Sequence, residues 1–200
     1  MTDRRTQAMR SAETRAALIA AARPLFAAHG YSAVGTETIV RTAGVTRGAL
    51  YYHFADKVEL FAAVFEAVEA EVSQRIGEAV AAADQSDPLV VMRLGANTWL
   101  DACAEPEIHQ IVLVDAPAVL GWARWTEIGN RYNIGLVRAL LAHAIEVGRI
   151  PPQPLDATAH TLLGALREAA LYLARADDHE QARRDTGAVI ERLIQALAVG

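Results

Sequence analysis

The sequence predicts an all-α protein, and three observations support that fold class. Apolar residues recur at helical spacing along most of the 200 residues, and no stretch shows the sustained apolar-polar alternation of a strand. Glycine and proline interrupt the helical pattern at a few places only. With 52% hydrophobic residues, a chain of this length can form the hydrophobic cores of a small N-terminal domain and a larger C-terminal domain.

The first helix is predicted from about residue 11 to residue 29. Its core face comprises Leu18, Ala22, Leu25 and Phe26. Gly30 is expected to end the helix in a left-handed conformation, and Pro24 is expected to kink it.

Two short helices follow, separated by a glycine turn. Thr36 is expected to cap a helix that carries Ile39 and Val40, and Gly44 then turns the chain before Thr46 caps the next helix. A helix, a tight turn and a second helix form the helix-turn-helix pattern, in which the second helix enters the major groove of DNA.

The second of these helices has two different faces. Leu50 and Phe54 are four residues apart and predict a buried edge. The other edge carries donors, aromatic rings and a glycine that allows close approach, which suits base edges and phosphates. Lys57, at the start of the next helix, is expected to meet a phosphate. The predicted DNA-binding residues are Thr36, Thr46, Arg47, Gly48, Tyr51, Tyr52, His53 and Lys57. The alternative is an ordinary helical hairpin with surface tyrosines.

The segment HGYSAVGTETIVRTAGVTRGALYYHFADKVELF resembles the DNA-binding domain of the tetracycline-repressor (TetR) family of bacterial transcription regulators. The resemblance rests on the Gly30-Tyr31 pair, the Ala-Gly-Val turn, the Leu-Tyr-x-His-Phe run and the lysine that follows. Val40 departs from the usual alanine, and Thr36-Glu37-Thr38 stands where many members carry an arginine and an acid. The resemblance implies a DNA-binding domain at residues 1–55 and a helical effector-binding and dimerisation domain at residues 56–200.

The remaining helices follow from periodicity and breaks. They are predicted at about residues 56–83, 89–104, 106–114, 122–147, 156–176 and 179–198, with breaks at 84–88 and 116–121. Asp156 is expected to cap the helix that follows Pro151, Pro152 and Pro154.

The charge of the chain is divided unevenly. Residues 1–60 hold eight basic and five acidic residues, a net charge of +3, and the rest of the chain carries −8. Phosphates would attract the basic end and repel the acidic end, which orients an encounter with DNA. The lone Cys103 cannot form an internal disulfide, and the sequence has no signal-peptide pattern or long apolar run. We therefore expect a cytoplasmic protein without a membrane segment.

The last two helices predict a homodimer through residues of about 156–198. Apolar residues surround most of the helix that contains Leu162, Leu166 and Leu173, which is more apolar surface than one domain needs. Small residues such as Gly164 permit close approach of a partner, and family members pair two such helices from each subunit. The alternative is a fully internal helix in a monomer.

An aromatic stripe on the long central helix suggests an effector site. Trp122, Trp125 and Tyr132 recur at helical spacing, and Trp99, Cys103 and His109 on neighbouring helices could converge on them. An apolar cavity with a few polar groups is the usual form of a small-molecule site. The alternative is that these side chains belong to the hydrophobic core and bind no ligand.

Enzymatic and metal-binding functions are not expected. The sequence shows no nucleophile elbow, phosphate-binding glycine loop or HExxH spacing, and its six histidines are scattered. No cofactor is predicted. The predicted function is that of a ligand-responsive, DNA-binding repressor that a small molecule releases from a near-palindromic operator. The alternatives are a structural dimerisation protein without sequence-specific DNA binding and a small-molecule enzyme.

Overall fold

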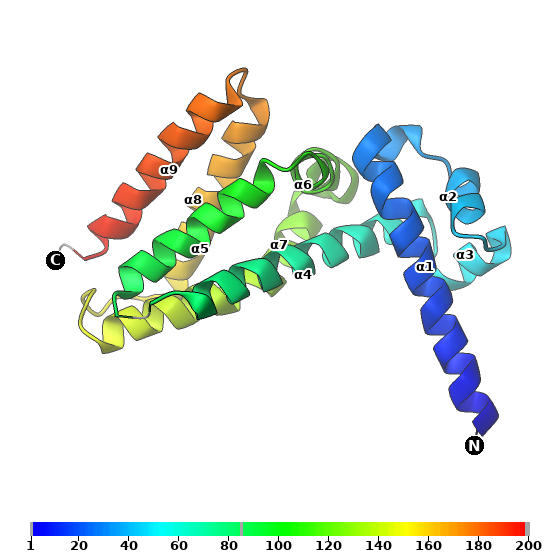
Figure 1. The fold of residues 1–200 in the computed structure, drawn as a ribbon, viewed down its shortest axis with the longest axis horizontal. Helices are drawn as coiled ribbons and strands as arrows, with labels where there is room; N and C mark the ends of the chain where they lie inside the picture. Colours follow the sequence, from blue (N-terminus) through cyan, green and yellow to red (C-terminus); the bar gives the residue numbers. More distant parts are fainter. Residues whose placement is uncertain (1, 85, 199–200) are drawn as a thin grey trace. The chain divides into compact units, whose positions relative to one another are not determined.

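The computed structural model describes residues 2–84 and 86–198, and these are helical throughout with short connections, which confirms the all-α prediction (Figure 1). The elements are α1 Thr2–Ala33, α2 Thr36–Thr42, α3 Arg47–His53, α4 Lys57–Ala82, α5 Pro88–Cys103, α6 Pro106–Ile108, the π-helix η1 His109–Asp115, α7 Ala116–Glu146, α8 Leu155–Arg175 and α9 His179–Ala196. Among the described helices, none is long and apolar enough to cross a membrane.

The chain forms two compact units. The first comprises Met1–Val68 and Pro106–Ala123, and the second comprises Glu69–Glu105 and Arg124–Gly200. The first unit therefore extends beyond the predicted DNA-binding domain of residues 1–55 and includes a segment from the middle of the chain. The helix α4 is continuous across the boundary at Val68.

The core of the first unit forms where α1, α2 and α3 meet the start of α4. The predicted core residues Leu18, Ala22 and Phe26 are fully buried. The rings of Phe26, Tyr31 and Phe61 pack with centroids 5.2 to 5.8 Å apart, a spacing typical of stabilising aromatic contacts.

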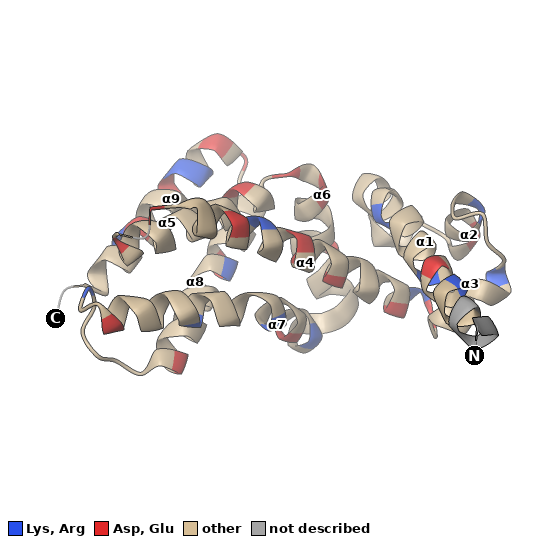
Figure 2. Ribbon diagram, turned by 60° about the horizontal axis from the view of Figure 1, so that its bottom comes forward, with Lys and Arg blue, Asp and Glu red and all other residues tan. Residues whose placement is uncertain are grey.

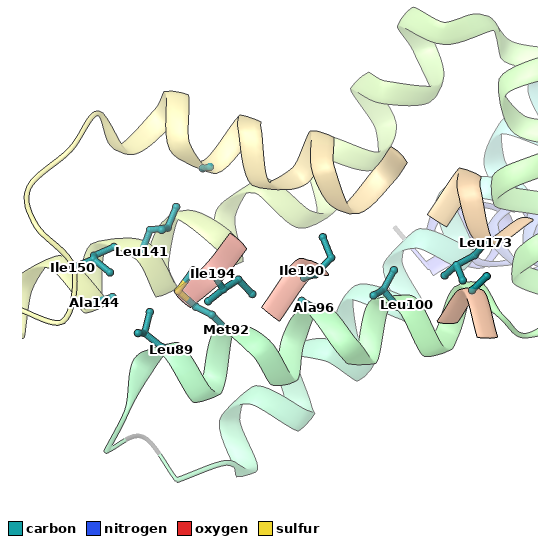
Figure 3. Packing of buried hydrophobic residues seen from close by; sticks show 12 residues of the cluster. Leu89, Met92, Ala96, Leu100, Leu141, Ala144, Ile150, Leu173, Ile190 and Ile194 are labelled. Carbon is teal, nitrogen blue, oxygen red and sulfur yellow. The ribbon is translucent and has the colours of Figure 1, made fainter. Parts of the chain in front are cut away.

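The core of the second unit lies among α5, α7, α8 and α9. Figure 3 shows Leu89, Met92 and Leu100 of α5 together with Ile190 and Ile194 of α9 in one buried hydrophobic cluster. With Ala96 included, these side chains recur every three or four residues along their helices, so each helix turns one apolar face inward. Asp87 and Asp178 cap α5 and α9 by accepting hydrogen bonds from the backbone N–H groups of Leu89 and Gln181.

Several predicted boundaries are wrong. The first helix begins at Thr2 rather than near residue 11, and its non-helical residue is Gly30, with φ 75°. Thr36 lies inside α2, whose N-cap is Gly35, and Asp156 lies inside α8, whose N-cap is Pro154. Pro154 fixes a backbone angle that suits a helix start, so Asp156 is not needed as a cap. Gly35 is already extended before α2, with φ −86° and ψ 150°.

The predicted short helix at 106–114 and the break at 116–121 also differ in the structure. The helical turn of α6 continues into the π-helix η1, and α7 starts directly at Ala116. The break narrows to Gly121, which has φ 74°, a value that glycine tolerates because it has no Cβ.

Candidate DNA-binding and effector sites

The helix α3 is held by a polar cap at its start and two apolar anchors. The hydroxyl of Thr46 accepts a hydrogen bond from the N–H of Ala49 at 3.2 Å, which confirms the predicted cap. Leu50 is fully buried and Phe54 is 4% exposed, as the spacing of the two residues predicts. The turn before α3 contains Gly44 with φ 66°, a conformation that favours glycine. The opposite face of α3 is therefore fixed towards solvent.

That face presents the predicted DNA-binding side chains. Tyr51 and Tyr52 are 44% and 79% exposed, and Arg47 and Gly48 are also exposed. A Cβ at Gly48 would meet only the Thr46 hydroxyl, at 3.8 Å, so packing within the described protein does not require glycine there. His53 is half-buried beside Tyr52, with ring centroids 5.0 Å apart. Figure 2 shows basic residues on α1 and around α2 and α3, whereas acidic residues lie along α4.

Arg47, Tyr51 and Thr36 form a small polar group on this face. The Arg47 guanidinium lies 5.6 Å from the centroid of the Tyr51 ring. Side-chain hydrogen bonds from Arg47 and Thr36 lower the pKa of the Tyr51 phenol. The Tyr51 hydroxyl thus connects the start of α2 to the first residue of α3, and the three side chains restrict one another.

Lys57 is bound within the protein. Its Nζ donates hydrogen bonds to the carbonyl oxygens of Tyr31, at 2.9 Å, and Val34, at 3.0 Å, and lies 3.9 Å from the centroid of the Tyr31 ring. Burial lowers the pKa of this ammonium, and the charge of Asp115 partly opposes that effect. An ammonium has three N–H groups, so these bonds leave one for a phosphate oxygen. The sequence suggested the phosphate but not the two carbonyl partners.

The segment of α6 and η1 holds the end of α1. Arg23 donates two hydrogen bonds to the Glu107 carboxylate, at 2.8 and 2.9 Å, in the bidentate arrangement that is strongest for this pair. The carboxylate of Asp115 accepts a hydrogen bond from the backbone N–H of Tyr31 at 2.8 Å. A Cβ at Gly30 would lie 3.4 Å from the amide nitrogen of Gln110, so the two segments approach closely.

The predicted effector residues are divided between the two units. His109 and Trp122 belong to the first unit, and Trp122 is 59% exposed. Trp99, Cys103, Trp125 and Tyr132 belong to the second. Trp99 packs against the core of α5, α8 and α9. Cys103 and Trp125 lie around a buried polar cluster, Cys103 within reach of the charge of Glu69 and Trp125 against Arg167. The backbone carbonyl of Tyr132 accepts a hydrogen bond from the Ser73 hydroxyl at 2.9 Å.

The centre of that cluster is Glu69 of α4, which is 2% exposed. Its carboxylate accepts a hydrogen bond from the Asn133 side chain at 3.0 Å. Burial raises the pKa of Glu69 to about 7, opposed by the Asn133 hydrogen bond and the charge of Arg167. Burial raises the pKa of Cys103 as well, and the charge of Glu69 adds to that rise. The guanidinium of Arg167 lies 5.6 Å from the Trp125 ring centroid.

Sequence reasoning missed Glu69, although a signal was present. Glu69 continues an apolar stripe of α4 that includes Phe61, Phe65, Val72 and Ile76, and each of these neighbours is buried. An acid at a core position of such a stripe must be neutralised or hydrogen-bonded, so it marks a site where polar chemistry is retained in the core. Among the described residues, no group of three or more His, Cys, Asp or Glu side chains is placed to hold a metal ion.

The outer faces of α8 and α9 carry exposed apolar side chains. Tyr172, Val189 and Leu193 are 57%, 51% and 43% exposed. A Cβ at Gly164 would meet nothing within 4 Å, so the backbone of α8 is open to close approach there. Leu166 differs from these residues because it packs against the core of its own unit.

Comparisons with known proteins agree with this architecture. Residues 18–64 match the family model "Bacterial regulatory proteins, tetR family", and residues 90–197 match "Tetracyclin repressor-like, C-terminal domain". The second match alone covers more than half of the chain.

Individual relatives lead to the same group of proteins. The chain is 28% identical over 191 residues to the HTH-type transcriptional regulator AcrR of Shigella flexneri, covering 89% of this chain and 87% of AcrR. It is 33% identical over 134 residues to the regulator CymR of Pseudomonas putida, covering 66% of each. A TetR-family regulator from Pectobacterium atrosepticum has a similar crystal structure, with a TM-score of 0.86, 34% identity and coverage of 96% of this chain and 97% of that one.

Proposed function

Because the chain belongs to the TetR family of bacterial transcriptional regulators, we propose that α3 reads an operator and that a small molecule releases the protein from it. The chain is a DNA-binding transcriptional regulator and not an enzyme. The observation that carries the proposal is the exposed face of α3, where Arg47, Tyr51 and Tyr52 stand opposite the buried Leu50 and Phe54. We place its action in the cytoplasm, where bacterial DNA lies.

The proposed DNA contacts have two roles. Arg47, in the first turn of α3, makes a bidentate contact to a guanine, which specifies sequence. The other residues position the protein through phosphates and thymine methyl groups. They are Thr36, Thr46, Gly48, Tyr51, Tyr52, His53 and Lys57.

A homodimer would present two copies of α3 to successive major grooves. Their centres would lie about 34 to 36 Å apart, one turn of B-DNA, on a near-palindromic site. The exposed Tyr172, Val189 and Leu193 support an interface on α8 and α9.

The effector would act through the helix α4. Its first residue, Lys57, binds the end of α1, and the same helix carries Glu69 in the second unit. A ligand that prefers one orientation of α4 would shift the population of dimers able to bind DNA, and a coupling of about 1 to 3 kcal/mol is typical. Trp99, Cys103, Trp125, Tyr132, Trp122 and His109 remain the proposed ligand-binding residues.

The test is selection of DNA fragments from random sequence with the purified full-length protein, followed by mobility shift of the selected fragment. We expect a near-palindromic consensus whose affinity falls when Arg47 is replaced by Ala. Binding without sequence preference, or selection that Arg47→Ala leaves unchanged, would contradict the proposed role of α3.

A further inference from the structure

The buried Glu69 has acceptor capacity beyond its contact with Asn133. A carboxylate offers about four lone-pair positions, and Asn133 donates one hydrogen bond to Oε2. The Asn133 side-chain nitrogen also donates to the carbonyl of Gly129 at 2.9 Å, so its two N–H groups are both engaged. A Cβ at Gly129 would lie 3.9 Å from Glu69 Oε1, so this oxygen lies beside the backbone of α7.

The surroundings of Glu69 are both aromatic and charged. Trp125 is 4% exposed and its ring lies beneath the Arg167 guanidinium. Arg167 is also held by a hydrogen bond of its Nη2 to Oδ1 of Asn130, at 2.8 Å. The positive charge of Arg167 acts on Glu69, so the cluster combines one acid, one base and two amides beside an indole ring.

This charge balance selects among ligand classes. An anion would be repelled by Glu69, and a cation would be repelled by Arg167, which already covers the Trp125 ring. A neutral molecule with a hydroxyl group avoids both costs and adds a further donor to the buried carboxylate. The indole ring supplies an apolar contact for an aromatic ligand.

We propose that Glu69 accepts a hydrogen bond from the hydroxyl group of a neutral aromatic effector, with Asn133 holding the carboxylate in place. The inference rests on the proposed function, because it assigns a chemical class to the effector of that regulator. Glu69 is in this view a ligand-binding residue, and Asn133 is a positioning residue.

The test uses full-length protein and four probes that share one apolar body: 4-propylphenol, its methyl ether 4-propylanisole, 4-propylbenzylamine and 4-propylbenzoate. Binding is followed by tryptophan fluorescence and calorimetry in wild type, Glu69→Gln and Glu71→Gln. Glu71 is an exposed residue of the same helix and serves as the matched control. Thermal melting checks that each variant is folded.

We expect the phenol to bind at least about tenfold more tightly than the other three probes, as a hydrogen bond to a charged group provides. Glu69→Gln should remove about this advantage, and Glu71→Gln should keep it. Phenol binding should also release protons near pH 7 in wild type but not in Glu69→Gln, because a donated hydrogen bond favours the ionised carboxylate. Arg167 and Cys103 are the other titratable groups that interact with Glu69. A guanidinium stays protonated in proteins, and burial raises the pKa of the Cys103 thiol well above its usual range, so neither group should contribute to the proton release.

Equal binding of the four probes, stronger binding of the amine or the benzoate, or no binding of the phenol up to about 1 mM would overturn the inference. An unchanged phenol affinity in Glu69→Gln would overturn it as well. Operator binding of the ligand-free protein is measured separately and does not depend on any of these results. Loss of that binding would instead count against the proposed function.

Discussion

The Lys57 ammonium contacts Tyr31 twice, through the ring, 3.9 Å from its centroid, and through the carbonyl oxygen, at 2.9 Å. With the third contact, to the Val34 carbonyl, it satisfies backbone acceptors where the chain leaves α1. Lys57 therefore stabilises the first unit before any DNA is bound.

We expect Lys57→Met to lower the free energy of unfolding by about 1 to 2 kcal/mol, because the carbonyls of Tyr31 and Val34 each lose the hydrogen bond from Nζ while the apolar stem is kept. Urea denaturation measures this effect, with Arg41→Met, an exposed basic position on α2, as the control.

Lys57 is the sole lysine of the sequence, so its side chain gives one NMR signal in lysine-labelled protein. Titration of this signal should give a pKa below 10.5, and an equal or higher value would contradict the burial of the ammonium.

Arg47→Ala is expected to cost about 1 to 3 kcal/mol on the best operator and to relax sequence preference at the contacted base. Tyr51→Phe should have a smaller effect in the same direction, because it removes the hydroxyl that links Arg47 to Thr36. Mobility shift on specific and random DNA measures both. Arg192→Ala, at an exposed position of α9, is the control and should leave both affinities unchanged. Equal losses on specific and random DNA for Arg47→Ala would assign this residue to phosphate binding.

Val189→Glu combined with Leu193→Glu is expected to yield folded monomers, since both side chains are exposed within one chain and two carboxylates would be buried at the proposed interface. Light scattering after size exclusion measures the mass, and operator affinity should fall with it. Val90→Glu, at a similarly exposed position of α5, should leave the dimer intact. A dimeric double variant would move the interface away from these two residues.

Glu69→Gln is expected to change how stability depends on pH. The pKa of Glu69 rises from 4.5 to about 7 on folding, so the folded state retains a proton that the unfolded state loses between these values. The stability contributed by the protonated form is complete below pH 4.5 and is lost as pH rises through 7. The full difference corresponds to about 3 kcal/mol, so Glu69→Gln should exceed wild type by up to about that amount at pH 8 and by little near pH 5. Urea denaturation between pH 5 and pH 8 measures the free energy of unfolding, with Glu71→Gln as the control. The same pH dependence in Glu69→Gln and Glu71→Gln would contradict the burial of Glu69.

The helix-turn-helix could be predicted because its signals are local. Thr46 caps the helix within three residues, and the spacing of Leu50 and Phe54 determines which edge is buried. The cap at Thr36 was wrong because Gly35 already provides the extended residue before α2. A polar side chain at a helix start does not by itself specify which residue begins the helix.

The arrangement around α1 and Glu69 could not be predicted, because it depends on contacts between distant segments. The apolar pattern of residues 109–115 fits an α-helix or a π-helix equally well, so the side-chain directions of Gln110 and Asp115 did not follow from spacing. Asn133 and Arg167 are ordinary polar residues in the sequence, and only the fold brings them to the carboxylate of Glu69. The role of the predicted effector residues stays a prediction.

The partners of α1 also determine when the first unit can be completed during synthesis. Lys57 follows Tyr31 by 26 residues, whereas Glu107 and Asp115 each follow their partners by 84 residues. Closing the longer loop costs about 1 kcal/mol more in chain entropy. A nascent chain that ends at Val68 has α2, α3 and the lysine contacts but lacks both carboxylates. The helix α3 can therefore fold early on the ribosome, whereas the contacts that Glu107 and Asp115 make to α1 form only after residue 115 has emerged.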